Sequence, residues 1–294
     1  MECYRDLYDV KLNGLESGTY ITIGTFDGVH KGHQELIRKV VKESKNNHGM
    51  SLVITFDPLP KEFFSSKSFI RLTTSSIRAE RIASLGVDIL LEYTFNDQFS
   101  RIRANEFLTN ILVPLNPKKI FIGRDFKFGY KGSGELSDLI QAGISYGFEV
   151  EVLDFVFSRN QRISSTRIRK AIRVGDIELA NQLMGKRHEI QGSIVRAMHE
   201  SKLLFFPHTN VMIPPNGEYM ISLYYRDKEH VTTARIMGAN QPLEIKWSKS
   251  LLYDDLHSHV TLFFLNSMPM VKGKISCDAR GDSYGKNPGS IQVS

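Results

Sequence analysis

The sequence predicts an α/β domain with a parallel sheet, followed by a small antiparallel β domain. Between about residues 18 and 185, short β-rich runs alternate with helical patterns. Several of these runs are apolar throughout, as strands covered on both faces should be. Beyond about Lys186 the helical periodicity stops, and short β-type runs follow one another with turn-like stretches between them.

Strands separated by helices indicate βαβ units, and these units give a parallel sheet with helices on both sides. The strands that we expect are 20–23, 51–56, 89–93, 119–122 and 148–153. One helix begins near His33, and a second begins near Ser75 with Gly86 as its C-cap. Two further helices run through 104–112 and 134–147. Such sheets bind ligands at the carboxyl ends of their strands.

The second part of the chain contains β-type runs at 189–197, 217–225, 230–237, 243–247 and 259–265. Turn-like stretches such as "PPNG" and "GANQP" lie between them. The last residues, 274–294, are rich in Gly, Ser and Asp and are expected to form a frayed tail. We therefore divide the chain into domains at 1–186 and 187–294.

Composition indicates the number of domains and the cellular location, but it does not identify a ligand. The chain has 294 residues with 41% hydrophobic content, enough for two domain cores. Its 38 Lys and Arg residues against 32 Asp and Glu suit anionic small molecules as well as nucleic acid. Cys3 and Cys277 form neither a disulfide framework nor a metal spacing. A charged N-terminus and the lack of a run of roughly 18 apolar residues favour a cytoplasmic protein without membrane insertion.

The stretch "GTFDGVHKGHQ", residues 24–34, directly follows the first expected strand. If that strand ends near Thr25, the loop leads into a helix whose first N–H groups are unpaired and whose dipole end is positive. This end of a helix attracts phosphate. Gly28 and Gly32 allow a tight turn and the close approach of a ligand. His30 and His33 then lie on one face and can donate hydrogen bonds to phosphate oxygens.

This arrangement suits nucleotidyl transfer, in which the protein mainly positions phosphates and stabilises developing charge. Gly24, Phe26 and Asp27 belong to the same stretch, and we expect them to contribute to the nucleotide site. The alternative is a structural turn with two surface or capping histidines. A zinc site is not expected, because no nearby motif supplies a third ligand.

A second motif, "RISSTRIRKAIRVGD", spans residues 162–176. Its Ser and Thr residues are natural N-cap residues, and Ile168, Ala171 and Ile172 form an apolar stripe at helical spacing. Arg167 and Arg169 lie off that stripe. The motif is therefore either an amphipathic helix with a solvated basic face or a second clamp on a triphosphate.

Two further segments follow expected strands. "GRDFKFGYKGSGEL" carries four glycines and three aromatic residues, Phe126, Phe128 and Tyr130. It is a flexible loop, a mobile flap or a stacking surface for a planar ring. "ITFDPLPKEFF" carries Pro58 and Pro60 just beyond a strand, where a rigid loop can shape the rim of a pocket.

These motifs resemble a known family, the bacterial bifunctional riboflavin kinase and FAD synthetase, in its N-terminal FMN adenylyltransferase module. The likeness covers about residues 18 to 190 and includes "GTFDGVHKGH", "TFDPLP", "IGRDFKFGYKGSGEL" and "ISSTRIRKAIRVGDIELANQLMGK" in the family's order. The resemblance implies a Rossmann-like nucleotidyltransferase domain. It also implies that the phosphate of FMN attacks the α-phosphorus of ATP, giving FAD and pyrophosphate with the help of Mg²⁺.

The resemblance also assigns roles to residues. His30, His33 and Arg169 are the expected catalytic residues, and no protein metal ligand is expected. The positions that match the family's other nucleotide or flavin contacts are Arg162, Ser165, Thr166, Asp125, Phe126, Phe128, Pro58 and Pro60. One departure is Leu59, which stands where the family has a histidine between two prolines. We expect small-molecule substrates rather than nucleic acid or membrane, and we make no prediction of the oligomeric state.

The second domain departs further from the family. The family's kinase module has a Gly-rich strand leading into "GFPTAN", whereas this chain has "SKLLFFPHTNV" from Ser201. Phe205 replaces a glycine and His208 replaces a threonine, although Pro207 and Asn210 persist. Glu244 is a candidate for the position of the family's catalytic glutamate. We therefore expect residues 187–294 to form a degraded riboflavin kinase-like barrel with a frayed C-terminal tail.

Three other functions remain open at this point. The first is a complete bifunctional kinase and synthetase, and the second is an inactive flavin or nucleotide sensor. The intact phosphate motifs disfavour the sensor. The third is another nucleotidyltransferase that shares the His-x-Gly-His motif but acts on glycerol phosphate or phosphopantetheine. The Gly-Arg-Asp-Phe loop and the Ser-Ser-Thr-Arg segment favour FMN as the substrate.

Overall fold

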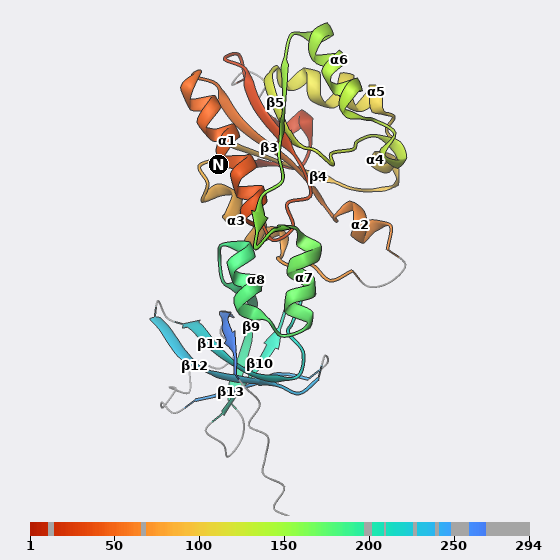
Figure 1. Cartoon of the computed structure of the whole chain (residues 1–294). Coiled ribbons are helices and arrows are strands. Elements are labelled where there is room, and N and C mark those ends of the chain that lie inside the picture. The colour runs from red at the N-terminus through yellow and green to blue at the C-terminus, as the bar shows by residue number, and fades with distance from the viewer. Residues whose placement is uncertain are drawn as a thin grey trace, which may run out of the picture.

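The structure of the chain is a computed structural model that describes residues 1–10, 15–65, 69–196, 202–208, 210–225, 228–238, 241–247 and 259–268. Within these residues a layered α/β body is followed by a closed β-barrel, and a pair of helices lies between the two (Figure 1). The expected tail, residues 274–294, and Cys277 lie outside the described residues. Cys3 is exposed and forms no disulfide.

The first body contains a six-stranded sheet in the order β1-β4-β3-β2-β5-β6, and every neighbouring pair is parallel. Its strands are β1 (Glu2–Tyr4), β2 (Thr19–Ile23), β3 (Met50–Asp57), β4 (Ile89–Thr94), β5 (Pro117–Gly123) and β6 (Glu149–Leu153). All five strands expected from the sequence are present. β2 is buried at all of its positions because helices cover both faces of the sheet.

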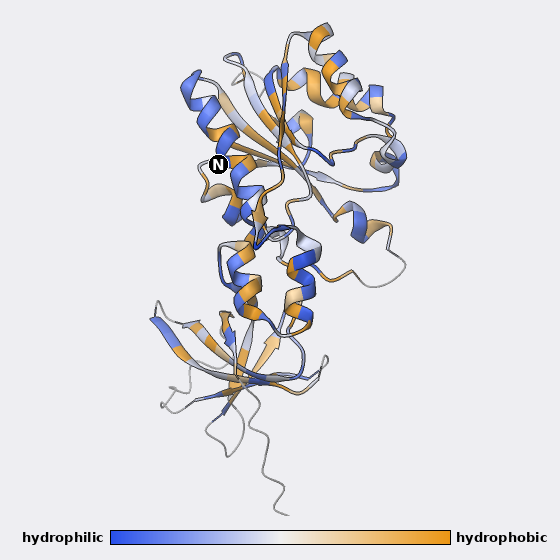
Figure 2. Ribbon diagram, viewed as in Figure 1, coloured by the Kyte–Doolittle hydropathy of each residue, from blue (hydrophilic) through white to orange (hydrophobic). Residues whose placement is uncertain are grey.

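Helices cover the two faces of this sheet in separate layers. α1 (Lys31–Asn46) and α3 (Ser75–Ala83) pack on one face through a core that includes Ile37, Val40 and Ile82. α5 (Ala104–Phe107), a π-helical turn η3 (Leu108–Leu112), a 3₁₀ turn η4 (Val113–Leu115) and α6 (Leu136–Tyr146) pack on the other face. Figure 2 shows the apolar residues concentrated in the strands between these layers.

Short elements connect these layers. They are η1 (Leu7–Asp9), α2 (Pro60–Phe63), α4 (Asp97–Ser100), η5 (Tyr130–Gly132) and a small hairpin of β7 (Phe157–Ser158) and β8 (Gln161–Arg162). α7 (Ser165–Arg173) and α8 (Ile177–Met184) follow the hairpin and pack against each other. Their shared core also includes Leu72 of the first body and Met212 of the segment after β10, so these helices join the two bodies.

The barrel is closed and antiparallel, with the strand order β10-β13-β12-β11-β14-β9. Its strands are β9 (His188–Arg196), β10 (Lys202–Pro207), β11 (Gly217–Tyr225), β12 (Lys228–Ile236), β13 (Leu243–Lys246) and β14 (His259–Ser267). Closure removes the exposed edges of the sheet. The predicted fold class, a parallel α/β domain followed by a small antiparallel barrel, is therefore confirmed.

Some local details differ from the expectation. β1 and β10 were not predicted as strands, because β1 has only three residues and two of them are exposed, and β10 includes a terminal proline. α3 ends at Ala83 with Ser84 as its C-cap, so Gly86 is not the capping residue. Gly86 instead adopts a φ of 86° in the turn that leads toward β4, a conformation that glycine tolerates well.

Candidate active site

The cavities nearest to the predicted motifs lie at the carboxyl ends of the strands and share parts of their linings. Pocket A, about 300 Å³, lies between the starts of α1 and α7. Pocket B, about 510 Å³, extends from it toward the ends of β5 and β6. Pocket C, about 390 Å³, has seven phenylalanines in its lining. Pockets A and B share Thr25, His30, His33, Lys61, Asp125 and Arg162.

The loop between β2 and α1 is strongly constrained. Phe26, Gly28 and Val29 have φ values of 46°, 81° and 42°. A non-glycine residue rarely adopts such values without support from its surroundings. Two nearly buried arginines of α3 provide this support. Arg78 donates to the carbonyl of Thr25 at 3.3 Å, and Arg81 donates to the carbonyl of Gly28 at 2.9 Å.

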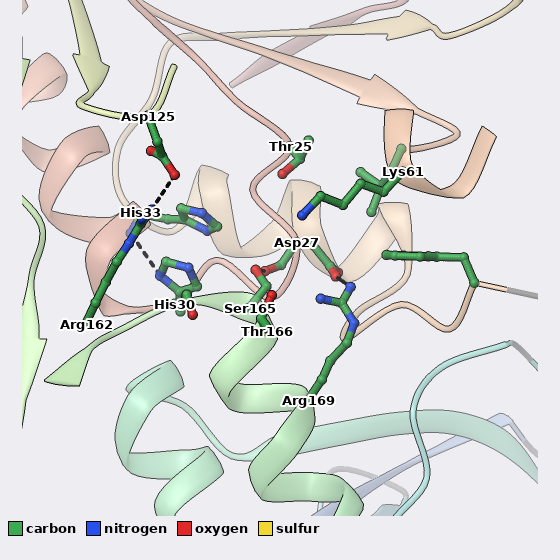
Figure 3. A pocket seen from close by; sticks show the side chains of 13 residues that line it. Thr25, Asp27, His30, His33, Lys61, Asp125, Arg162, Ser165, Thr166 and Arg169 are labelled. Carbon is green, nitrogen blue, oxygen red and sulfur yellow. Dashed lines mark hydrogen bonds and ion pairs between the residues drawn. The ribbon is translucent and has the colours of Figure 1, made fainter. Parts of the chain in front are cut away.

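His30 and His33 lie at the start of α1, as the motif predicted. His30 is the N-cap residue, and its Nδ1 accepts a hydrogen bond of 3.2 Å from the backbone N–H of His33. This bond places the proton of neutral His30 on Nε2. The two imidazole rings stack with centroids 3.5 Å apart. Figure 3 shows both rings at the edge of pocket A, beside Arg162.

Both imidazoles are neutral at physiological pH. Burial lowers the pKa of His30 to about 4, and the positive charge of Arg162 acts in the same direction. Burial also holds the pKa of His33 well below its usual value, with a further contribution from His30. A neutral imidazole has one N–H donor and one acceptor nitrogen, and in His30 the acceptor Nδ1 is already used by the N–H of His33.

α7 presents the second motif to the same pocket. Ser164 is its N-cap and accepts a 3.3 Å hydrogen bond from the N–H of Arg167, whereas Ser165 donates to the carbonyl of Asp27 at 3.0 Å. Arg169 forms an ion pair with Asp27, and its guanidinium lies 4.7 Å from the centre of the Phe69 ring. The start of α7 is thus fastened to the loop that precedes α1.

Asp27 is almost completely buried, with 3% of its surface exposed. Burial raises the pKa of its carboxyl, while Arg169 opposes this shift most strongly among its neighbours. The carboxylate also accepts a 3.0 Å hydrogen bond from the N–H of Leu72. Asp27 therefore orients Arg169 and holds the segment after residue 68, in addition to lining pocket A.

Asp125 and Arg162 face each other across the boundary between pockets A and B. Their side chains form an ion pair of 2.6 Å, and Arg162 also lies 3.6 Å from the centre of the Phe155 ring. Both side chains remain partly exposed, at 60% and 40%. The guanidinium of Arg162 therefore remains accessible from the pockets while it is paired with Asp125.

The glycine-rich loop after β5 forms a wall of pocket C. Phe126 and Phe128 stack with centroids 5.6 Å apart, and Phe128 is 6% exposed. An isolated β-bridge between Phe128 and Gly134 closes the loop. Gly129 has a φ of 73° and lies close to Ala104. A Cβ atom added to Gly129 would lie 2.7 Å from the backbone of Ala104. The loop is therefore packed against its surroundings, and Phe126 and Phe128 line pocket C.

The structure brings most of the predicted site residues together. Pocket A is lined by Asp27, His30, His33, Asp125, Arg162, Ser165, Thr166 and Arg169. Pockets B and C add Gly24, Phe26, Gly32, Pro60, Phe126 and Phe128.

Gly28 and Pro58 line none of these three pockets. Gly28 instead has a structural role, since its N–H donates to Thr73 and its carbonyl accepts from Arg81.

Sequence reasoning missed several lining residues. Lys61 lines pockets A and B from α2, and Phe69 lines pocket A. Leu59, which the sequence marked only as a departure from the family motif, also lines pocket A. Leu59, which departs from the family's histidine, is 2% exposed. Lys61 directly follows the predicted proline rim, but a lysine at the start of a short helix gives no signal by itself.

The barrel also contacts the segment that supports pocket A. Asn210 and Met212 form backbone hydrogen bonds with Arg71, at 3.3 and 2.8 Å. The side chain of Asn210 donates to the carbonyl of Phe69 at 3.2 Å. Arg169 donates to the carbonyl of the adjacent Ile70 at 3.2 Å. The segment that carries Phe69 is therefore held between α7 and the barrel.

The residues at the positions of the family's kinase motif are either buried in the barrel core or bonded to other side chains of the barrel. Phe205 is fully buried in the barrel core, and a Cβ atom on Gly192 would lie 2.5 Å from its ring. His208 is hydrogen-bonded through Nε2 to the hydroxyl of Ser193. Glu244 lies on β13 and forms a 3.6 Å ion pair with Lys202.

Neither a metal cage nor a membrane span is found in the described part of the chain. No three or more His, Cys, Asp and Glu side chains converge there in a way that would hold a metal ion. No helix among the described residues has the length and apolarity that crossing a membrane requires.

Comparisons with known proteins agree with this geometry. Residues 13–167 match the model of the FAD synthetase family. A bifunctional riboflavin kinase/FMN adenylyltransferase of Buchnera aphidicola subsp. Schizaphis graminum is 37% identical over 219 residues, covering 74% of this chain and 70% of the relative. The protein of the same name from Listeria monocytogenes is 34% identical, covering 74% of this chain and 71% of the relative.

A solved structure shows a similar arrangement over almost the whole length of the chain. It is described as a macrolide-efflux protein from Streptococcus pneumoniae, and it is 25% identical with a TM-score of 0.81. The match covers 94% of this chain and 93% of that structure. The likeness therefore extends through both the parallel sheet and the barrel.

Proposed function

Since this chain belongs to the FAD synthetase family, we propose that it acts as an FMN adenylyltransferase in pockets A, B and C. The reaction transfers AMP from ATP to FMN and releases pyrophosphate. We further propose that residues 1–186 form the adenylyltransferase domain and that residues 187–294 form a second domain, which includes the barrel and has no kinase activity.

The phosphates of ATP bind at pocket A in this proposal. Two helix starts meet there, and each offers unpaired N–H groups and the positive end of a helix dipole. His30 and His33 contribute neutral donors from α1, while Ser165 and Thr166 contribute hydroxyl groups from α7. Arg162 and Arg169 line the same pocket. A triphosphate is a ligand that satisfies this concentration of donors.

The flavin ring of FMN binds in pocket C. This pocket is lined by several phenylalanines, and it shares Ile23, Phe56, Pro60, Phe126 and Lys127 with pocket B. A planar aromatic ring stacks favourably on such side chains. Because pocket B shares residues with both other pockets, a flavin in pocket C can extend its phosphate toward the ATP phosphates in pocket A.

The chemistry follows from this placement. An oxygen of the FMN phosphate forms a bond to the α-phosphorus of ATP, while the bond from that phosphorus to the bridging oxygen of pyrophosphate breaks. The pyrophosphate leaves with the electron pair. No protein nucleophile is required. His30, His33 and Arg169 stabilise the negative charge that develops on the phosphorus and on the leaving group.

Mg²⁺ is expected to accompany ATP. This ion usually keeps several waters and binds substrate phosphates, with only one or two protein carboxylates. The two carboxylates of pocket A are already paired, Asp27 with Arg169 and Asp125 with Arg162. When bound with ATP, the metal would neutralise phosphate charge. The sequence predicted no protein ligand for it, and of the two carboxylates in pocket A only Asp125 is exposed enough that it would contact the ion. We also propose a cytoplasmic location, where ATP and FMN are available.

The observation that carries the proposal is the convergence of the α1 and α7 starts on one pocket, joined by the Arg169–Asp27 ion pair. The test is to incubate the full chain with FMN, ATP and Mg²⁺ and to resolve the flavins by chromatography. We expect FAD to accumulate together with pyrophosphate. A folded sample that gives no more FAD than a control without protein would refute the proposal.

A further inference from the structure

Lys61 differs from the other cations that line pocket A, because no described residue balances its charge. Arg162 is paired with Asp125 and Arg169 is paired with Asp27. His30 has a pKa of about 4, and the pKa of His33 also lies well below its usual value, so neither adds charge at neutral pH. Among the residues that the structure describes, the ammonium of Lys61 has no hydrogen-bond or ion-pair partner. It therefore supplies the net positive charge of the pocket.

The acidic residues closest to Lys61 in the chain are occupied elsewhere. Glu62 forms an ion pair of 2.5 Å with Arg71 and also accepts a 3.2 Å hydrogen bond from the N–H of Leu59. Asp57 forms a second ion pair with Arg71, at 2.6 Å. Arg71 thus pairs with both carboxylates, and neither of them is paired with Lys61 in the described part of the chain.

These contacts also fix the position of the lysine. Arg71 joins the end of β3 to α2 through Asp57 and Glu62. Leu59 is buried and directly precedes α2, and Pro60 is the first residue of that helix. Lys61 therefore extends from a supported turn, and Figure 3 shows its amine directed into pocket A near Thr25 and Asp27.

The place of Lys61 between the pockets suggests which phosphate it binds. It lines pockets A and B, whereas its neighbour Pro60 lines pockets B and C. It thus lies between the aromatic pocket and the helix starts. A flavin ring held in pocket C would extend its phosphate past α2 toward the α-phosphorus of ATP. At that point two anionic groups must approach each other closely, and an unpaired cation offsets their repulsion.

We propose that Lys61 binds the phosphate of FMN and is the residue that distinguishes FMN from riboflavin at this site. The inference rests on the proposed adenylyltransferase function. The lysine keeps its protons throughout the reaction. It orients the attacking phosphate oxygen and reduces the repulsion between FMN and ATP, and it is not an acid, a base or a nucleophile.

The test compares flavin binding and turnover in the full chain for Lys61→Met, Lys61→Arg and Lys170→Met. Methionine keeps much of the apolar stem and removes the charge. Lys170 is the matched control, since it is an exposed lysine of α7 that lines none of the three pockets. Dissociation constants are measured for FMN and for riboflavin, which lacks the phosphate. kcat and KM are then measured for FMN at saturating ATP and Mg²⁺.

We expect Lys61→Met to weaken FMN binding by about 10-fold or more, as loss of a charge-assisted contact to phosphate should. Riboflavin binding should change less than about two-fold, and kcat/KM for FMN should fall by roughly 10². Lys61→Arg should recover part of the FMN affinity, and Lys170→Met should behave as the parent chain.

Three results would overturn the assignment. One is an equal loss of FMN and riboflavin affinity in Lys61→Met, which would indicate a packing role. Another is an unchanged affinity for FMN. The third is a rise in KM for ATP without any change for FMN, which would place the lysine on the nucleotide. If the parent chain binds FMN but forms no FAD, the proposed function fails, while the comparison of FMN with riboflavin still decides the role of Lys61.

Discussion

Arg81 of α3 and Glu189 of β9 form an ion pair that joins the α/β body to the barrel. Nε and Nη2 of Arg81 lie 3.1 and 2.7 Å from Oε1 of Glu189. The same guanidinium donates to the carbonyl of Gly28 in the loop before α1 and to the carbonyl of Arg187. The barrel is therefore coupled through one nearly buried side chain to the loop that precedes α1, where His30 and His33 line pocket A.

The first prediction concerns this pair. Arg81→Met should lower the free energy of unfolding by about 3 kcal/mol, because it leaves the partly buried Glu189 and the Gly28 carbonyl without their partner. Urea denaturation measures the change. Arg101→Met is the control, since Arg101 and Asp97 form a pair that is mostly exposed, and its effect should stay within about 0.5 kcal/mol. Equal stability of the two variants would contradict the coupling.

The fold was largely predictable from the sequence because its strands are apolar runs of ordinary length. β1 was missed, because its three residues pair only where β4 offers a free edge, and that edge exists only in the folded sheet. The same reasoning applies to the site. The histidines and Ser165 belong to local motifs, and their convergence follows from the rule that ligands bind at the ends of parallel strands.

Lys61 and Arg81 could not be found in the same way. The position of Lys61 depends on Arg71, which is ten residues away and binds both Asp57 and Glu62. The role of Arg81 depends on a carbonyl 53 residues earlier and a carboxylate 108 residues later. Neither relationship has a local sequence pattern, so the structure was needed to reveal them.

The second prediction concerns His30 and His33. Replacing either with alanine should lower kcat by roughly 10² or more, the scale observed when one preorganised donor to developing charge is removed. FMN binding should persist, because pocket C does not include these residues. Steady-state formation of FAD measures turnover, and His48→Asn is a suitable control on an exposed histidine with a φ of 53°. Near-normal turnover in both alanine variants would return the histidines to a structural role.

The third prediction concerns the pH dependence of stability. His188 of β9 is fully buried, its Nε2 lies 2.6 Å from the carbonyl of Met212, and burial lowers its pKa to about 4. Between pH 6.5 and 4 the unfolded chain binds a proton at this residue that the folded chain does not. The stability contributed by neutral His188 is therefore complete above about pH 6.5 and is lost as the pH falls toward 4.

His188→Gln keeps a donor for the Met212 carbonyl but does not titrate. The parent chain should lose stability between pH 7 and 4.5, and His188→Gln should lose less. The difference between the two losses should be at most about 3 kcal/mol, which corresponds to the lowered pKa of His188. Urea titrations at a series of pH values measure the difference. Parallel pH profiles for the two proteins would show that His188 is not protonated on unfolding in this range.

The fourth prediction concerns the second phosphate motif. Ser165→Ala and Arg169→Ala should each raise KM for ATP, by about 10-fold or more for Arg169, while FMN affinity changes little. Arg173→Ala is the control on the same helix, since Arg173 is exposed and lines none of the three pockets. An unchanged ATP dependence in both site variants would mean that the basic face of α7 is only solvated surface.

Arg169→Ala also leaves the buried carboxylate of Asp27 unpaired, so a loss of activity alone does not establish contact with ATP. Asp27→Asn combined with Arg169→Ala removes that charge and should recover part of the lost stability. KM for ATP should remain high in the double variant. If the double variant recovered both its stability and the parent value of KM for ATP, the contribution of Arg169 would be structural.

The last prediction is that the barrel has no riboflavin kinase activity. Phosphoryl transfer depends on holding nucleotide phosphates and metal closely against the backbone. Phe205 fills the barrel core where the family has a glycine, and the His208 side chain is bonded to Ser193 where the family has a threonine. Mg²⁺ prefers oxygen ligands to the nitrogen that histidine offers.

Incubation with riboflavin, ATP and Mg²⁺ should therefore give neither FMN nor FAD, whereas the same preparation supplied with FMN should give FAD. Sustained formation of FMN from riboflavin would show that these substitutions are compensated and that the chain is a complete bifunctional enzyme.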